Sequence, residues 1–132
     1  MPLFRISEAA RLLGVSDDTV RRWLKSGQLR AVEDQAGRHV VDGAKLAAFA
    51  RARAATVADP SEVGRSARNR FVGLVTNVVA DKVMAQVEIQ AGPHRVVSLL
   101  STEAVRELGL EPGAVAVAVV KATNVVIETP RE

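Results

Sequence analysis

The chain contains no cysteine and few aromatic side chains. Among its 132 residues Cys is absent, and Phe, Trp and Tyr together make up only 3%. The lack of cysteine excludes disulfide bonds, thiolate metal sites and cysteine nucleophiles, and it permits a reducing compartment. Because 48% of the residues are hydrophobic, any core must be built from Val, Leu, Ile and Ala. Small aliphatic cores are marginal in isolation, so the composition favours association between chains.

Long apolar runs and catalytic constellations are also missing. The chain begins Met1-Pro2-Leu3-Phe4-Arg5-Ile6-Ser7-Glu8, with an acid where a signal peptide needs an apolar stretch, and no segment approaches the ~20 apolar residues of a membrane span. These absences predict a soluble cytoplasmic protein with no membrane partner. The sequence also lacks an acid pair, a metal-ligand cluster, a phosphate loop and a nucleophile with its base. We therefore expect neither an enzyme nor a protein with a cofactor or a bound metal cation.

The length suits two very small domains, and the charge is divided unevenly between them. Residues 1–65 hold eleven Lys and Arg against eight Asp and Glu, a net charge of +3, whereas residues 66–132 hold seven of each. We predict domains at 1–54 and 66–132, joined by a linker at 55–65 that allows some independent motion. An excess of three charges neutralises few phosphates, so tight binding to nucleic acid would require a dimer or a larger assembly.

The first domain shows the pattern of a helix, a glycine turn and a second helix. Apolar positions that follow Ser7, the expected N-cap, predict a helix that Gly14 ends. Ser16 is expected to cap the second helix, which Gly27 ends. The buried stripe of that second helix is expected to consist of Val20, Trp23 and Leu24.

A short hairpin and a third helix complete the first domain. Strands are expected at 29–32 and 38–41 around a turn at 33–37, followed by a helix over 44–54. The result is a winged helix-turn-helix, which reads double-stranded DNA through its second helix. The candidate DNA contacts on the second helix and the wing are Ser16, Thr19, Arg21, Arg22, Lys25, Arg38 and His39.

The sequence leaves the roles of these cations open. Arg21 and Arg22 could form a solvated helix face, but their place on the second helix favours contact with nucleic acid. An arginine that binds guanine in a bidentate manner contributes ~1–3 kcal/mol of discrimination, whereas a phosphate contact adds affinity without specificity. His39 could sense pH, although a wing histidine more often contacts the backbone or a phosphate.

The segment from Phe4 to about Phe49 resembles the MerR-type winged helix-turn-helix, especially its excisionase-like and BldC-like members. The resemblance depends on Glu8-Ala9-Ala10, Gly14-Val15-Ser16, Thr19-Val20-Arg21-Arg22-Trp23 and Ser26-Gly27-Gln28-Leu29. The wing departs from the family pattern of Gly-Gly-His-Arg-Arg-Tyr. This chain has Ala36-Gly37-Arg38-His39-Val40-Val41 there, so one wing arginine and the tyrosine are absent.

The second domain reads as a small β-barrel. Alternating apolar residues predict strands at 71–79, 84–90 and 94–100, a helix over 102–108, a turn at 111–113, and final strands at 114–121 and 124–128. Five short strands and one helix predict an OB-like barrel. The expected fold class is therefore α+β with two small domains, an N-terminal helical winged helix-turn-helix and a C-terminal five-stranded OB-like β-barrel with one short helix.

Residues from about Ser66 to Ile127 resemble the Mop or TOBE module of molbindins and molybdate-responsive regulators. The motifs are Ser66-Ala67-Arg68-Asn69, Gly73-Leu74-Val75, the run 101–110, Glu111-Pro112-Gly113 and Val120-Lys121-Ala122-Thr123. The resemblance implies that molybdate or tungstate binds at interfaces between modules, in a homo-oligomer such as a dimer or a trimer of dimers. The ligand-binding residues that it implies are Ser66, Ala67, Arg68, Ser101, Lys121 and Ala122.

The chemistry of these residues agrees with an oxyanion ligand. Molybdate is a tetrahedral dianion, so a selective site needs several converging hydroxyl, N–H and cationic donors. Ala104 stands where the family often has a serine, which removes one expected donor. Without the resemblance, Ser66 and Arg68 would simply begin a strand, Ser101 would cap a helix and Lys121 would be an exposed charge.

Together these features predict a molybdate- or tungstate-responsive transcriptional regulator, in which oxyanion binding changes operator affinity. Two alternatives remain open. The chain could be an intracellular molybdate-binding or storage protein that its DNA-binding domain merely localises, or an architectural DNA-binding protein whose barrel only oligomerises. The sequence does not separate molybdate from tungstate, because both present nearly the same oxygen tetrahedron.

Overall fold

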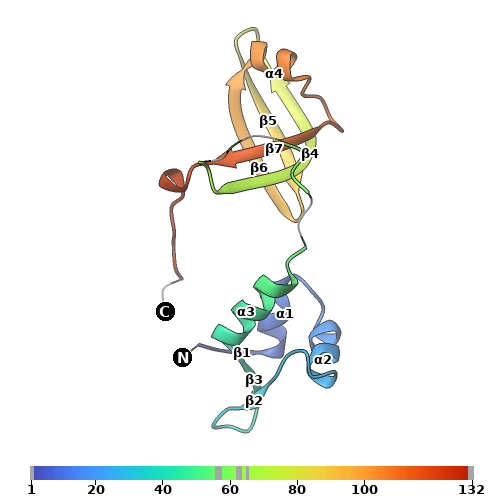
Figure 1. Cartoon of the computed structure of the whole chain (residues 1–132), viewed down its shortest axis with the longest axis vertical. Coiled ribbons are helices and arrows are strands. Elements are labelled where there is room, and N and C mark those ends of the chain that lie inside the picture. Colours follow the sequence, from blue (N-terminus) through green and yellow to red (C-terminus); the bar gives the residue numbers. More distant parts are fainter. Residues whose placement is uncertain (1, 56–57, 62–63, 65, 131–132) are drawn as a thin grey trace. The chain divides into compact units, whose positions relative to one another are not determined.

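The chain divides into two compact units, Met1–Thr56 and Val57–Glu132. The structure is a computed structural model in which residues 2–55, 58–61, 64 and 66–130 are described (Figure 1). The first unit contains β1 (Leu3–Arg5), α1 (Ile6–Leu13), α2 (Asp17–Lys25), β2 (Val32–Glu33), β3 (His39–Asp42) and α3 (Gly43–Arg53). The second contains β4 (Asn69–Ala80), β5 (Met84–Ala91), β6 (His94–Ser101), α4 (Thr102–Leu108), β7 (Val115–Val120) and the short 3-10 helix η1 (Ala122–Asn124). No helix within the described parts of the chain is long and apolar enough to cross a membrane.

The first helix begins one residue before the predicted cap. Ser7 lies inside α1, and Arg5 occupies the cap position with its N–H donating to Glu8 Oε1 at 3.1 Å. The prediction of Ser7 as N-cap was wrong because β1 pairs with β3 and delivers the chain directly into the helix. The prediction for α2 is confirmed, since Ser16 Oγ accepts the N–H of Thr19 at 3.1 Å.

The core of the first unit lies between its three helices and its small sheet. Val20 of α2 and Val41 of β3 are fully buried, and the remaining buried members are Ala9, Ala10, Leu29 and Leu46. Of the predicted stripe on α2, Val20 is therefore central, whereas Trp23 and Leu24 are half-buried and pack against this cluster. This packing fixes the rotation of α2 and leaves its charged side chains outward.

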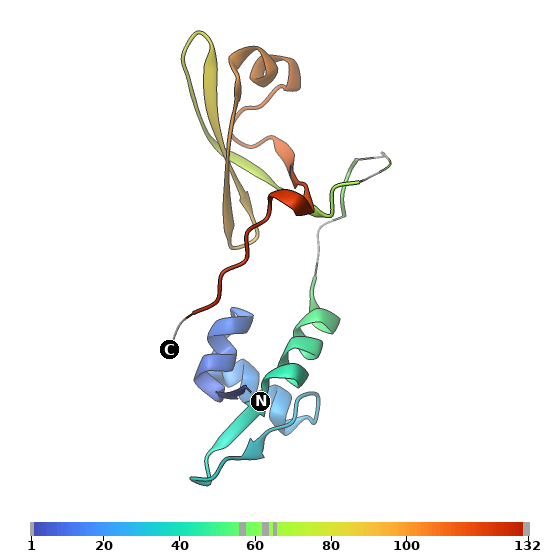
Figure 2. The same ribbon diagram turned by 90° about the vertical axis from the view of Figure 1, so that its left-hand side faces the viewer.

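The wing is shorter than the sequence predicted. The sheet has the order β1-β3-β2, and β2 pairs with β3 only from Val32 to Glu33. The expected strand at 29–32 is mostly absent because Leu29 is buried in the core, where its N–H donates to the Trp23 carbonyl at 3.2 Å. Figure 2 shows the hairpin extending from the first unit. In its turn, Asp34 Oδ1 accepts the N–H groups of Ala36 and Arg38, both at 2.9 Å.

The end of α3 is held on α2 by an arginine that lies over two aromatic rings. The Arg53 guanidinium is 4.8 Å from the centroid of the Trp23 ring and 5.4 Å from that of Phe49, and its Nη1 donates to Gln28 Oε1 at 2.9 Å. We expect Arg53→Ala to lower the free energy of unfolding of this unit by about 1 kcal/mol. It should also shift the fluorescence of Trp23, the single tryptophan.

Arg51→Ala is the matched control, because Arg51 is an exposed arginine in the same last turn of α3. Unfolding by urea, followed by Trp23 fluorescence, gives both readouts in one measurement. Equal stability and equal emission in the two variants would show that the stacked guanidinium does not hold α3 on α2.

The second unit is a four-stranded antiparallel sheet with the order β6-β5-β4-β7. The twelve residues of β4 pair with β7 through the first half and with β5 through the second, and a bulge between Val75 and Asn77 bends the strand between them. The core beneath the sheet consists of Val75, Ala85, Val87, Ile89 and Val105. The helix predicted at 102–108 is confirmed as α4, which Gly109 ends in the left-handed conformation.

The predicted fifth strand is not formed within the chain. Residues 124–128 were expected to be a strand, but η1 ends at Asn124 and the following residues belong to no strand. Apolar alternation identifies a segment that can become a strand, whereas a strand exists only where an edge supplies its backbone hydrogen bonds. Val126 and Ile127 are accordingly 81% exposed. Both outer strands, β6 and β7, keep one edge without a partner strand within the described residues.

Two tight turns are held by carboxylates. Asp81 Oδ1 accepts the N–H groups of Val83 at 2.7 Å and Met84 at 2.8 Å, and these hydrogen bonds lower the pKa of Asp81 below its ordinary 3.8. The pKa of Asp34 is lowered in the same way, first by the N–H of Arg38. A carboxylate whose pKa falls on folding stabilises the fold when the pH is above its ordinary pKa. This stabilisation is lost as the pH falls through the lowered pKa.

We therefore expect both carboxyl groups to titrate below pH 3.8 in the folded protein, which carboxyl carbon chemical shifts measured by NMR would report. Their contribution to stability should be complete near neutral pH and should be lost only in acid below that value. In Asp81→Asn the part of the acid-induced loss of stability that comes from the Asp81 carboxylate should disappear. A titration of Asp81 at or above 3.8 would contradict the role of its hydrogen bonds.

Candidate functional site

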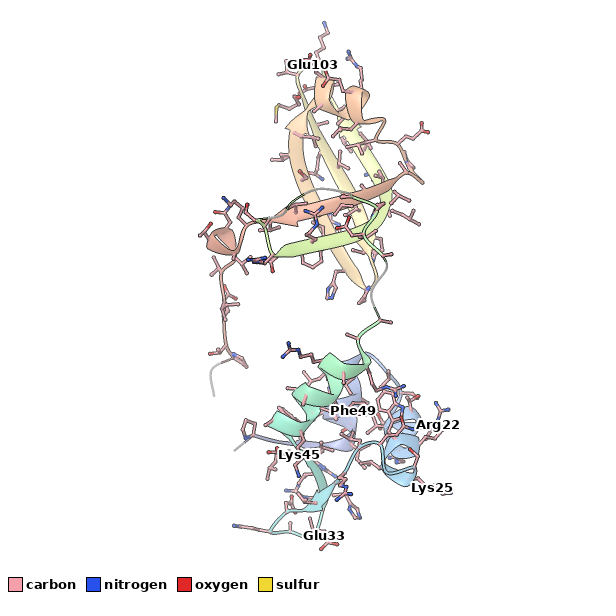
Figure 3. All side chains as sticks on the ribbon, in the orientation of Figure 1. Arg22, Lys25, Glu33, Lys45, Phe49 and Glu103 are labelled. Atoms are coloured by element: carbon pink, nitrogen blue, oxygen red, sulfur yellow. The ribbon has the colours of Figure 1, made fainter. Side chains whose placement is uncertain are left out.

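The outer face of α2 carries three exposed cations. Burial of Val20 turns Arg21, Arg22 and Lys25 toward solvent, and Figure 3 shows Arg22 and Lys25 projecting from the side of this helix. Arg21 Nη1 lies 3.4 Å from Asp18 Oδ1 in a pair whose side chains are 57% and 92% exposed. Exposed pairs of this kind contribute about 0–1 kcal/mol, so Arg21 can exchange Asp18 for an external anion at little cost.

The hydroxyls predicted to contact DNA already have intramolecular partners. Ser16 Oγ and Thr19 Oγ1 lie 3.0 Å apart, and Arg22 Nη2 donates to Thr19 Oγ1 at 3.1 Å. Together with the cap on the N–H of Thr19, these bonds order the first turn of α2 and hold the Arg22 side chain along the helix. A positioned guanidinium loses less freedom on binding than a free one.

The two predicted wing residues differ in their surroundings. Arg38 Nε donates to Asp34 Oδ2 at 2.9 Å, so its charge is partly neutralised within the turn. His39 is exposed at the start of β3, where its register partner on β2 is Glu33. The structure thus places all seven candidate DNA contacts in the first unit, five on or capping α2 and two in the hairpin.

Sequence reasoning missed one basic residue of the same unit. Arg30 is exposed and lines a shallow hollow together with Arg21, Lys25 and His39. A signal was present in the sequence, because Arg30 is a basic residue that directly follows the apolar Leu29 and comes shortly after the predicted second helix. The segment had been interpreted only as a strand of the hairpin.

In the second unit, two of the predicted ligand-binding segments meet at one end of the sheet. Asn69, the first residue of β4, is opposite Val120, the last of β7, and its Nδ2 donates to the Val120 carbonyl at 3.1 Å. The residues that precede β4 are Ser66, Ala67 and Arg68, and those that follow β7 are Lys121 and Ala122. Segments separated by about fifty positions in the sequence are therefore neighbours.

The cations at this end of the sheet are not equally available. Arg70 Nε pairs with Asp59 Oδ2 at 2.7 Å, and both side chains are about 15% exposed or less. Arg68 and Lys121 are exposed, and no acidic partner for either is found among the described residues. Asp59 belongs to the predicted linker, of which residues 56–57, 62–63 and 65 lie outside the described part. Among the described residues at this end, Arg68 and Lys121 are therefore the cations open to a ligand.

The remaining predicted residue lies at the opposite end of the same sheet. Ser101 ends β6 opposite Met84, and its Oγ accepts the N–H of Ala104 at 3.1 Å. Its neighbour Thr102 is buried and donates from Oγ1 to the Asp81 carbonyl at 2.9 Å. Figure 1 shows α4 and η1 at opposite ends of this unit. Along β4 the separation is on the order of 30 Å, so one chain does not bring all six residues together.

Comparison with known proteins assigns a class to each unit. Residues 3–54 match the helix-turn-helix domain family, and residues 65–127 match the TOBE domain family. The chain is 41% identical over 63 residues to molybdenum-pterin-binding protein 2 of Clostridium pasteurianum, covering 47% of this chain and 93% of that protein. It is 43% identical over 63 residues to the probable molybdenum-pterin-binding protein of Haemophilus influenzae, covering 47% of this chain and 91% of that one.

A solved structure extends the likeness to the fold. The cytoplasmic molybdate-binding protein ModG, determined with molybdate bound, superposes with a TM-score of 0.51 at 41% identity, over 55% of this chain and 52% of ModG. The chain therefore belongs to the TOBE family, with a helix-turn-helix domain fused in front of the TOBE domain. Both are families of binding modules rather than of enzymes.

Proposed function

We propose that this protein is a DNA-binding transcriptional regulator that responds to molybdate or tungstate. The observation that carries the proposal is the fusion itself, which joins a helix-turn-helix unit with exposed cations on α2 to a TOBE unit whose relatives are named for molybdenum or molybdate binding. Tungstate is included because its oxygen tetrahedron suits the same donors. As the ModG relative is described as cytoplasmic, we place the protein in the cytoplasm.

The oxyanion site is formed between chains. Its donors are the Ser66 hydroxyl, the N–H groups of Ala67, Arg68 and Ala122, and the Lys121 ammonium from one chain, with Ser101 from another. A dianion needs donors that converge on it, and Ser101 stands at the far end of the sheet in its own chain. Two copies arranged with unlike ends together satisfy this requirement. The proposed assembly is a homo-oligomer, either a dimer or a trimer of dimers.

Unpartnered apolar surface supports association of the second units. A hollow of about 540 Å³ in this unit is lined mainly by aliphatic side chains of β5, β6 and β7. The extended segment after η1 adds Val125, Val126 and Ile127, which are 44–81% exposed. An open strand edge beside an unpaired apolar segment favours pairing with another chain. We therefore propose that this segment contributes to the contacts within the oligomer.

Ligand binding then acts on DNA through the assembly. Domains at 1–54 and 66–132 with a linker at 55–65 allow the oxyanion to fix the spacing of the attached helix-turn-helix units. The residues proposed to contact double-stranded DNA are Ser16, Thr19, Arg21, Arg22, Lys25, Arg38 and His39. Equal affinity for operator DNA with and without saturating molybdate and tungstate would eliminate this coupling.

Calorimetric titration of the full-length protein with molybdate, tungstate and sulfate tests the ligand site directly. We expect heat of binding from the first two and little from sulfate. Lys121→Ala removes a charge-assisted hydrogen bond and should weaken molybdate binding about 10- to 100-fold. Lys45→Ala removes the same charge from an exposed position on α3 and should bind molybdate as the natural protein does. Unchanged affinity in Lys121→Ala would remove Lys121 from the site.

A storage function is the second candidate, because the Clostridium pasteurianum relative consists of little more than the matched segment, which covers 93% of that protein. Molybdate binding at high stoichiometry without sequence-specific DNA binding would support storage and exclude the regulator. A protein that binds DNA but none of the three oxyanions would instead be architectural, with a TOBE unit that only holds the chains together.

A further inference from the structure

The surface between α2 and the base of the wing contains a hollow with a basic rim. It has a volume of about 530 Å³, and its rim carries the side chains of Arg21, Lys25, Arg30 and His39. Its remaining lining consists of Ile6, Leu24, Gly27, Leu29 and Ala31. No acidic side chain is among the described residues that line this hollow, which we call the basic hollow.

The fold fixes where Arg30 lies. After α2 the chain turns at Gly27, whose φ of +81° suits glycine, and Leu29 then enters the core with 4% exposure. Arg30, the next residue, is exposed. His39 is also exposed, at the start of β3 beside Val40, which is 3% exposed. Two basic residues from different segments thus lie beside α2, each next to a buried residue.

The charges of the basic hollow are available to an external anion. Lys25, Arg30 and His39 have no hydrogen-bonding or ionic partner among the described residues, and Arg21 has only its exposed pair with Asp18. The positive charges of Arg21, Lys25 and Arg30 lie around a hollow that no acidic side chain lines, and an anion placed between them is attracted by all three. The hollow is also continuous with the face of α2 that carries Arg22, because Arg21 and Lys25 belong to both.

We propose that the basic hollow binds the DNA backbone, with Arg30, Lys25 and His39 contacting a phosphate and the apolar lining contacting the adjoining deoxyribose. This inference rests on the proposed DNA binding of the first unit and adds Arg30 as a positioning contact beside α2. A phosphate bound there would set the register of α2 on the duplex without reading a base. The basic side chains of the hollow complement the negative phosphate, and its apolar lining suits the deoxyribose. This combination favours the DNA backbone as the occupant.

The test measures binding of full-length protein to a labelled 25-base-pair duplex by fluorescence anisotropy, at several salt concentrations and on two unrelated sequences. Loss of one phosphate contact lowers the slope of log K against log salt by about 0.9 and the affinity about eightfold at 0.1 M salt. We expect Arg30→Ala to lower the salt slope and the affinity by these amounts, once for each chain that contacts the duplex. The losses should be equal on the two sequences. Arg30→Lys should retain most of the slope, because lysine also binds phosphate as a point charge.

Lys45→Ala is the matched control, since Lys45 lies on α3 on the opposite side of this unit from Lys25 in Figure 3. It should leave both slope and affinity unchanged. If the natural protein binds duplex and Arg30→Ala matches it in affinity and slope, the basic hollow serves another partner, such as an acidic protein segment, and the inference is overturned. A loss confined to one sequence would mean that Arg30 reads a base. If the natural protein binds no duplex DNA, the proposed function fails together with this inference.

Discussion

Replacing Gly73 by alanine is expected to destabilise the second unit by about 3 kcal/mol. A Cβ at this position of β4 would lie 2.4 Å from the carbonyl oxygen of Gln90, 2.9 Å from its carbonyl carbon and 3.1 Å from Ala91 Cα. All three are backbone atoms of β5, so no side chain can rotate away, and the two strands must separate. Overpacking of this kind typically costs 1–3 kcal/mol and more where the neighbours cannot move.

Gly64→Ala provides the matched control, because a Cβ at Gly64 would meet no atom within 4 Å. Far-UV circular dichroism during urea unfolding reports the loss of the sheet, while Trp23 fluorescence reports the first unit separately. We expect Gly73→Ala to unfold at lower urea by the first measure and to be unchanged by the second. Equal midpoints for the two glycine variants would mean that β4 and β5 are farther apart than described.

The second large effect is expected on DNA binding. The double variant Arg21→Ala/Arg22→Ala removes two exposed guanidinium groups from the outer face of α2. If each contacts one phosphate, affinity at 0.1 M salt should fall about 60-fold and the salt slope by about 1.8. Electrophoretic or anisotropy titrations over a range of salt concentrations measure both quantities.

The double variant Lys45→Ala/Arg51→Ala removes the same charge from exposed positions on α3 and controls for the net charge of the unit. Equal losses in the two double variants would mean that DNA responds to overall charge and not to α2. A loss in the α2 variant that differs between sequences, with little change in slope, would show that one arginine reads a base edge.

Local patterns were sufficient for most of the helices. Ser16 and Ser101 were predicted as caps, and each accepts the N–H three residues later because a short hydroxyl side chain next to a helix start satisfies that donor. The family of each unit was likewise predictable, since motifs such as Ser66-Ala67-Arg68-Asn69 are contiguous in the sequence and match the TOBE family found by comparison.

Strand pairing was less predictable. The strand β1 has only three residues, so its pairing with β3 left no periodic signal, and Ser7 was consequently misplaced as a cap. The segment at 124–128 had the opposite problem. Its apolar residues predicted a strand, but among the described residues this segment pairs with no strand edge.

The amino-acid sequence was enough to establish a helix-turn-helix domain fused to a TOBE domain, because N-cap residues, glycine positions and short contiguous motifs identify both domains. Which cations act together was settled only in three dimensions. Pairing of Asn69 with Val120 brings Ser66–Arg68 beside Lys121, the antiparallel order β6-β5-β4-β7 sends Ser101 to the other end, and Arg30 lies exposed beside α2 next to the buried Leu29. These neighbours are distant in sequence, and only the register of strands and the choice of buried residues decide where they meet.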